Sequence, residues 1–305
     1  MTKRLLDCAA SDFAGMNKQE FLQAIAASEG RTLVCETIGT IQPMLGDITN
    51  AELAAAMGAD ILLLNMFDLQ NPVIRGLPPG SENPIALLKK LTGRKIGINL
   101  EPAGPARRTT EGIWAMTPGR MATAENARLA ADMGVDLIVV TGNPGNGVSN
   151  AAIEASLEQI RPACGGKVAL MAGRMHASGV LTEAGAQIIT PEDIAGFVAA
   201  GADIILLPAP CTVPGITAER VGALVAASHK LGVLAMTAIG TSQEGADTDT
   251  IRRIALLCKG TGADLHHLGD AGYGGIALPE NIFAYSVAIR GVRHTYSRMS
   301  RSVNR

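Results

Sequence analysis

The chain has 305 residues, of which 47% are hydrophobic and only 3% are aromatic. Its 26 Lys and Arg residues balance 28 Asp and Glu residues, and this formal net charge of −2 argues against a nucleic-acid-binding or membrane-binding surface. The five cysteines are scattered and form no CxxC pair, which is typical of neither a disulfide framework nor a zinc site. Asp7 and Asp12 come too early for a secretion signal. We therefore expect a cytoplasmic protein without nucleic-acid or membrane partners.

One local pattern occurs four times along the chain. Each copy places a glycine and an aspartate just before an apolar run such as ILLLN or LIVVT, at residues 57–60, 133–136, 200–203 and 261–264. This pattern is typical of a helix end, a left-handed glycine, a short turn and a buried parallel strand. Four further runs of the same type lie between the copies, at 32–37, 95–101, 167–173 and 233–239. The sequence thus predicts eight buried strands.

A helical pattern follows each predicted strand, and this alternation predicts an α/β protein built as one (β/α)8 TIM barrel. A doubly wound parallel sheet is the alternative, but the strand count is eight and no GxGxxG follows the first strand. We expect residues 1–31 to form an N-terminal helical extension that closes the bottom of the barrel. Residues 32–291 would form the barrel, and residues 292–305 a basic, solvated C-terminal tail.

The loops differ in length between the two ends of the predicted barrel. Turns that enter strands are short, whereas the loops at about 68–82, 102–122 and 174–189 follow strands and are long. Long loops of this kind usually carry function, and barrel enzymes keep their active sites on the face where strands end. The asymmetry therefore favours an enzyme.

Polar side chains at strand ends are the candidates for catalysis. Glu36 and Glu101 close strands 1 and 3, and His176 follows strand 5. Because side chains from alternate strands share a layer, we expect the three to converge on one pocket, as acid and base, with Glu36 and Glu101 as candidate ligands for Mg²⁺ or Mn²⁺. The alternative for each carboxylate is a salt bridge to an arginine such as Arg174. The residues expected to orient the substrate are Asn99, Asn143 and Arg174.

Strands 2 and 8 add further polar residues at the same face. Asn65 ends strand 2 and Asp270 follows strand 8. His266 and His267 are adjacent in strand 8, so they point to opposite faces and at most one lies inside the barrel. A hydrogen-bonded core histidine is the favoured interpretation of both.

The exits of strands 7 and 8 are rich in glycine. Glycines allow a close backbone approach, and phosphate-binding barrels hold the anion on backbone N–H groups between these two loops. The alternative is that the glycines only turn the chain. The predicted phosphate-binding residues are Gly240, Thr241, Ser242, Gly269, Gly272, Gly274 and Gly275.

Six segments resemble, essentially end to end, an uncharacterised bacterial TIM-barrel family: 49–60, 140–150, 171–176, 208–215, 238–247 and 279–291. Its members have carried labels such as haloacid dehalogenase-like hydrolase or phosphoenolpyruvate phosphonomutase-like protein, without an established activity. The resemblance implies the fold and no particular reaction. The DTDT run at 247–250 predicts a helix N-cap rather than a phosphatase motif, because a helical pattern follows it directly.

These features predict an enzyme that uses acid–base chemistry, of the isomerase or lyase type, on a small anionic and phosphorylated metabolite. Two alternatives stay open at this point. One is a flavin- or nicotinamide-dependent oxidoreductase that holds its cofactor in the same phosphate cradle, and the other is a non-catalytic metabolite-binding barrel. A homo-oligomer is compatible with the predicted enzyme and with both alternatives.

Overall fold

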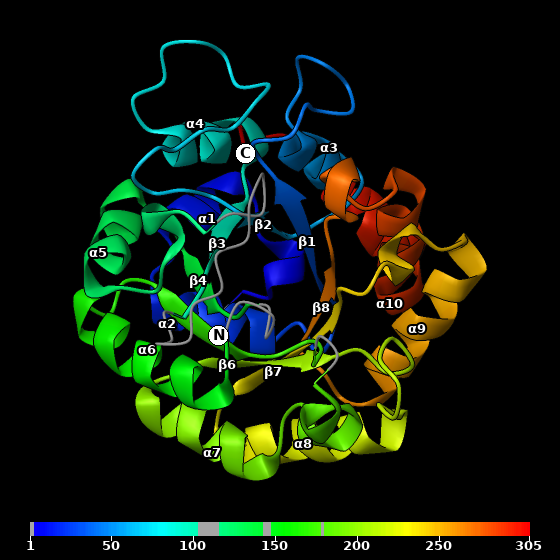
Figure 1. The fold of residues 1–305 in the computed structure, drawn as a ribbon. Helices are drawn as coiled ribbons and strands as arrows, with labels where there is room; N and C mark the ends of the chain where they lie inside the picture. Colours follow the sequence, from blue (N-terminus) through cyan, green and yellow to red (C-terminus); the bar gives the residue numbers. More distant parts are fainter. Residues whose placement is uncertain (1–2, 103–115, 143–147, 178–179) are drawn as a thin grey trace.

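The computed structural model describes residues 3–102, 116–142, 148–177 and 180–305. Eight parallel strands close into a barrel in the order β1 to β8, and at least one helix follows each strand. Figure 1 looks along the barrel, with the helices as an outer ring around the strands. The predicted TIM barrel is confirmed.

The strands are β1 (Thr32–Ile38), β2 (Ile61–Asn65), β3 (Lys95–Leu100), β4 (Leu137–Val140), β5 (Ala169–Gly173), β6 (Ile204–Pro208), β7 (Leu234–Ile239) and β8 (Leu265–Leu268). The outer helices are α3 (Asn50–Ala56), α4 (Pro84–Thr92), α5 (Ala124–Met133), α6 (Asn150–Ala163), α7 (Pro191–Ala200), α8 (Ala218–Lys230), α9 (Thr248–Gly260) and α10 (Pro279–Met299). Before β1 lie α1 (Ala10–Gly15) and α2 (Lys18–Ala26), and the 3-10 turns η7 (Gln243–Gly245) and η8 (Gly272–Gly274) follow β7 and β8. Within the described ranges, no helix has the length and apolar character needed to cross a membrane.

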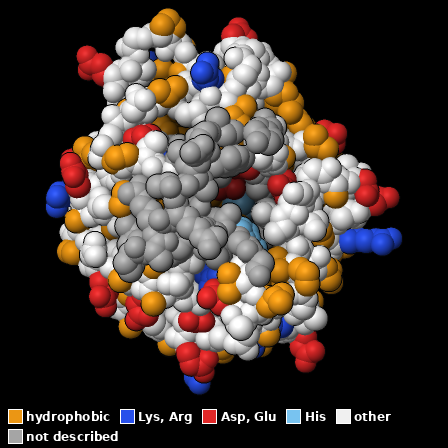
Figure 2. Space-filling model, viewed as in Figure 1, with side chains coloured by type: hydrophobic (Ala, Val, Ile, Leu, Met, Phe, Trp, Pro, Cys, Tyr) orange, Lys and Arg blue, Asp and Glu red, His pale blue; other side chains and the backbone are white. Residues whose placement is uncertain are grey.

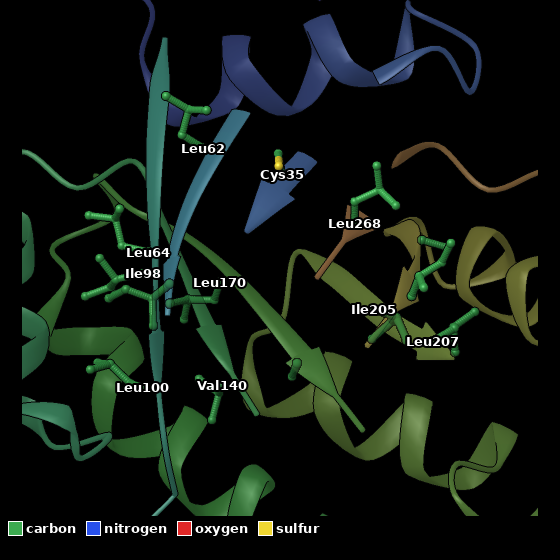
Figure 3. Packing of buried hydrophobic residues seen from close by; sticks show 14 of the residues in the cluster. Cys35, Leu62, Leu64, Ile98, Leu100, Val140, Leu170, Ile205, Leu207 and Leu268 are labelled. Carbon is green, nitrogen blue, oxygen red and sulfur yellow. The ribbon is translucent and has the colours of Figure 1, made fainter. Parts of the chain in front are cut away.

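Residues of the strands alternate between two buried clusters, as the pleat of a strand requires. One cluster fills the barrel and continues onto α1 and α2, where Phe13, Phe21 and Ile25 pack beneath strand residues such as Leu63 and Met171. The other lies between the strands and the outer helices, and Figure 3 shows part of it. The N-terminal helices therefore cover the end of the barrel where the strands begin.

The fourfold sequence pattern has a structural counterpart at that end. In each copy, the aspartate side chain accepts the backbone N–H of a residue in the preceding odd-numbered strand, and the backbone N–H of the aspartate donates to the carbonyl of the same residue. The four pairs are Asp60 with Leu33, Asp136 with Ile96, Asp203 with Leu170, and Asp264 with Ala235. This two-point contact holds each even strand against the odd strand before it, so the repeated aspartate has a structural reason.

The run at 247–250 is a helix start, as predicted. The Asp247 side chain accepts the backbone N–H groups of Asp249 and Thr250 at the beginning of α9. This geometry is that of an N-cap, and it excludes the buried strand end that a phosphatase nucleophile needs.

The basic C-terminal segment is not a solvated tail. Helix α10 bends at Gly291, whose φ of 73° is non-helical, and continues to Met299. Arg298 and Thr295 in the second part are fully buried, and the Arg298 guanidinium donates to the Leu5 and Cys8 carbonyls. The segment packs against the closed end of the barrel because Asp60 supplies a buried partner for its arginine.

Candidate active site

Polar side chains replace the apolar ones at the open end of the barrel. Glu36 lies on β1, Asn65 ends β2, Asn99 is on β3 and His267 is on β8, so the four come from neighbouring strands. Glu36, Asn65 and His267 each continue the inward-facing series of their strand, two residues after an apolar member of the interior cluster, and Asn99 stands two residues after Gly97. Figure 2 shows acidic and histidine side chains at the bottom of the hollow at the centre of this face.

Two amide side chains connect two carboxylates across this site. Asn99 Nδ2 donates to Glu36 Oε1 at 2.5 Å and to Asn65 Oδ1 at 3.2 Å. Asn65 Nδ2 donates in turn to Asp270 Oδ2 at 2.7 Å. On the other side of Glu36, His267 Nε2 lies 3.6 Å from Glu36 Oε2. Glu36 fixes the orientation of the Asn99 amide because a carboxylate only accepts hydrogen bonds, and the Met66 N–H, which donates to Asn65 Oδ1, fixes that of Asn65.

Asp270 has the properties of a group that exchanges a proton near neutral pH. Its side chain is half-buried, and its Oδ1 accepts the Gly272 N–H at 2.8 Å. Burial raises the pKa of Asp270, the nearby Glu36 and Glu244 charges raise it further, and the Asn65 and Gly272 hydrogen bonds oppose them, which leaves it at about 7. A carboxyl group with such a pKa is suited to act as both base and acid.

Glu244 is a third carboxyl group at this site. It is buried in the turn η7, and burial raises its pKa, with the charge of Glu36 as a smaller cause in the same direction. A side chain at Gly269 would place its Cβ 3.4 Å from Glu244 Cδ and 2.8 Å from the Ile239 carbonyl oxygen. Glycine at position 269 therefore lets the Glu244 carboxyl group lie against the end of β8.

Three buried polar atoms of the site have no hydrogen-bond partner among the described residues: Asn99 Oδ1, His267 Nδ1 and Glu244 Oε2. Buried polar groups in proteins are nearly always paired, so such atoms point to a polar ligand or ordered water. Two of the three are oxygen acceptors, and they would pair with a hydroxyl or amino donor.

Backbone strain gathers at the same end of the barrel. Of the five non-glycine residues with positive φ in the described ranges, Met66, Cys211, Ser242 and Ala271 lie just after β2, β6, β7 and β8. Left-handed backbone costs energy for residues with a side chain, and it is concentrated at functional sites. The strain is a second observation that favours this face as the active site.

A model of the domain of unknown function DUF7916 matches residues 6–305. The chain belongs to the DUF7916 family. A search of curated proteins gave no match. Among solved structures, the DUF7916 chain is similar to one described as "a putative lyase/mutase from Burkholderia cenocepacia J2315", with 19% identity, 88% of this chain and 84% of that chain covered, and a TM-score of 0.51. Because 1068 solved chains match, the fold by itself selects no reaction.

The predicted site residues of the DUF7916 chain have different surroundings. Glu36 and Asn99 belong to the hydrogen-bonded network described above. Glu101 forms an ion pair with Arg120 at 2.6 Å, which is the salt-bridge alternative, with a different arginine from the one expected. The convergence of Glu36 with Glu101 and His176 stays a prediction.

Residues near the end of β5 form another group. Arg174 is buried, its Nη2 contacts Glu183 at 2.6 Å and its Nε lacks a partner in the described part of the chain. Burial lowers the pKa of His176, and the charge of Arg174 lowers it further. The roles expected for these two residues stay predictions, and Asn143 lies outside the described residues.

The predicted phosphate cradle stays a prediction, and the structure shows that the loop after β8 has few N–H groups left for an anion. The backbone N–H groups of the four glycines after β8 are already used: Gly269 donates to Ile239, Gly272 to Asp270, Gly274 to Ala271 and Gly275 to Gly272. The Thr241 hydroxyl donates to the Thr212 carbonyl, Gly240 packs beside Met175, and Ser242 takes a left-handed conformation. The Asp270 and Glu244 carboxyl groups also lie at these loops, where they would repel phosphate. The flavin- or nicotinamide-dependent alternative likewise stays a prediction.

The two histidines of β8 differ. His266 faces the outer helices, where its Nε2 lies 3.0 Å from the Gly30 carbonyl oxygen and Tyr285 lies beside its Nδ1. Burial lowers the pKa of His266 to about 4, so this residue is the neutral core histidine that was expected. His267 faces the barrel interior with an unpaired Nδ1 in the described structure, so the core interpretation is wrong for it.

Glu244 was missed by the sequence analysis. A signal exists, since Glu244 follows the end of β7 within the same segment as the glycine and hydroxyl residues. In the described ranges, no group of three or more His, Cys, Asp and Glu side chains is arranged to hold a metal ion. A Mg²⁺ or Mn²⁺ ion bound by Glu36 and Glu101 stays a prediction, and no step below uses one.

Proposed function

We propose that this DUF7916 protein is an enzyme of the lyase or isomerase type that removes a proton from a carbon next to a carbonyl group in a small polar metabolite. The observation that carries this proposal is the chain of hydrogen bonds from Glu36 through Asn99 and Asn65 to Asp270 at the barrel mouth. The proposed reaction class is also that of the similar solved structure described as "a putative lyase/mutase", which shares the fold.

Asp270 would be the general base. In its ionised form it takes the proton from carbon, and in its protonated form it returns the proton to the product or to another carbon of the intermediate. A carboxyl group with a pKa of about 7 populates both forms at neutral pH. Asn65 holds its Oδ2 in place, so the reacting carboxyl group has one orientation.

Glu36 would act on Asp270 through charge. Glu36 is buried and accepts the Asn99 amide, and its negative charge makes the neighbouring carboxyl group hold its proton more tightly. Glu36 is thus proposed as the residue that tunes the base, and His267 as the group that faces it from β8.

The substrate would carry hydroxyl or amino donors. Asn99 Oδ1 and Glu244 Oε2 are buried acceptors that lack a partner in the described structure. A site that hydrogen-bonds a substrate hydroxyl or amino group rejects analogues without it, because its own polar atoms are then left unpaired. We therefore propose hydroxy- or amino-carbonyl compounds rather than phosphorylated ones as the substrate class.

Deuterium exchange tests this proposal without knowledge of the natural substrate. A panel of small hydroxy- and amino-carbonyl compounds is incubated with the protein in D₂O, and carbon-bound deuterium is measured by mass spectrometry. We expect the wild type to label at least one compound. Glu36→Gln should slow the labelling severalfold at a pH where Asp270 is ionised in both proteins, because Asp270 is a weaker base without the charge of Glu36.

Asp249→Asn is the matched control, because the Asp249 side chain is 81% exposed and lies on α9. It should label at the wild-type rate. A panel that acquires no deuterium, or equal labelling rates in wild type and Glu36→Gln, would contradict the proposed function.

A further inference from the structure

A second hollow lies at the opposite end of the barrel, beside the starts of β3 and β5. It has a volume of about 790 Å³ and is bordered by α1 and α4. Six basic residues line it: Lys89, Lys90, Arg94, Lys95, Lys167 and Arg305. Asp136 is the acidic residue that faces them among the lining residues. This excess of positive charge is local, since the whole chain has a formal net charge of −2.

Asp136 does not neutralise this group. Its carboxylate accepts the Ile96 N–H and forms ion pairs with Lys89 at 2.7 Å and Lys95 at 2.9 Å. Two ammonium groups thus share one carboxylate, which leaves one positive charge uncompensated. The Lys95 ammonium is nearly buried and also donates to the Met16 carbonyl, so it is fixed in place at the floor of the hollow.

Arg94 adds a buried positive charge. Its guanidinium donates to the carbonyl oxygens of Ala59, Thr92 and Arg298, so its hydrogen-bond partners are neutral. The charge of Asp60 acts on it without a direct ion pair between the two residues. Burial and the nearby charge of Arg298 lower the pKa of Arg94, the charge of Asp60 opposes them, and the pKa is left at about 9. An anion in the hollow would relieve this repulsion.

Lys90 and Lys167 stand at the rim and are exposed. The hollow therefore combines fixed charges at its floor with steering charges at its edge, between apolar walls such as Phe13 and Val135. Positive charges in a cleft with apolar walls raise the local concentration of anions. We propose that this hollow, which we call the basal groove, binds a small metabolite that carries at least two phosphate or carboxylate groups.

The charge pattern selects such a ligand. A single anion would compensate one of the lysines, whereas two linked anionic groups would reach from the floor lysine Lys95 to the rim lysines Lys90 and Lys167. The basal groove lies where the strands begin and the candidate active site lies where they end, so the ligand would be an effector or second ligand and not the substrate.

Calorimetric titration tests the proposal, with pyrophosphate and citrate as probes and sodium chloride at matched ionic strength as the reference. We expect pyrophosphate, citrate or both to bind with a 1:1 stoichiometry, and the affinity to fall as salt is added. The more tightly bound probe assigns phosphate or carboxylate as the recognised group. No binding of either probe would overturn the proposal.

Two double variants locate the binding. Lys90→Gln with Lys167→Gln removes the rim charges, and both residues are exposed, so the fold should be retained. We expect affinity for the bound probe to drop by about tenfold or more. Lys230→Gln with Arg253→Gln removes two exposed positive charges elsewhere and should leave the affinity unchanged. An equal loss in both double variants would overturn a site at the basal groove.

Lysine acetylation followed by mass spectrometry gives an independent readout. The bound probe should protect Lys90 and Lys167 from the reagent and leave Lys230 reactive. Equal reactivity of all three with and without the probe would contradict the proposal. Binding of a single-stranded oligonucleotide that displaces the probe and exceeds its affinity would overturn the small-metabolite class.

Discussion

Replacing Asp60 with asparagine is expected to lower the free energy of unfolding by about 3–5 kcal/mol, the usual loss when one partner of a buried ion pair is removed. Asp60 is fully buried and contacts Arg290 at 2.5 Å and Arg298 at 2.7 Å. It also accepts the Leu33 N–H. The variant would leave two buried guanidinium groups without their carboxylate, and it would loosen the docking of α10 on the closed end of the barrel.

Urea unfolding measures this loss, and Asp203→Asn is the matched control. Asp203 holds the same repeat position and accepts the Leu170 N–H, but its ion pair with Lys18 is partly exposed. Partly exposed pairs contribute little, so the control should lose only about 1 kcal/mol. Equal losses in the two variants would show that the strand contact, and not the buried arginines, accounts for the effect at Asp60.

Replacing Asp270 with asparagine is expected to reduce the rate of deuterium exchange by about 10²- to 10⁴-fold, the range that general acid–base groups contribute. Asparagine keeps the shape of the side chain and cannot take up a proton. The wild-type rate should rise with pH through about 7, as Asp270 loses its proton and becomes a base. The variant should lack this inflection.

The stability of the same variant separates a catalytic role from a structural one. The folded-state pKa of Asp270 is raised above the value of about 4 expected in the unfolded chain, so its contribution to stability falls as pH rises from about 4 to about 7. Relative to the wild type, Asp270→Asn should therefore become more stable as pH rises across this range. Equal pH dependence of unfolding in the two proteins would contradict the environment assigned to Asp270.

Much of the fold could be predicted because its determinants are local. The glycine and aspartate of each repeat lie at a helix end and a strand start, and Asp136 and Asp203 make the same contact in two different copies. The C-terminal segment was mispredicted for the opposite reason. Its basic composition suggests solvent exposure, whereas the burial of Arg298 depends on Asp60, which is far away in the sequence.

The candidate site could be predicted only in part, because strand-end residues are recognisable in the sequence and their hydrogen-bond partners are not. Glu36 and Asn99 are recognisable as polar residues that end buried strands, and the structure joins them directly. The glycine-rich loops suggested a phosphate cradle because glycines reveal where a backbone can approach a ligand. They do not reveal which acceptors already occupy the N–H groups, and Asp270 takes that of Gly272.

The proton affinity of Asp270 is the most direct test of the proposed acid–base site. The carboxyl carbons of aspartate are labelled with ¹³C, the Asp270 signal is identified by its absence in Asp270→Asn, and its shift is followed with pH. We expect a midpoint near pH 7 in the wild type and a lower midpoint in Glu36→Gln, because that variant removes a negative charge that raises the pKa of Asp270. A midpoint near pH 4 in both proteins would contradict the account.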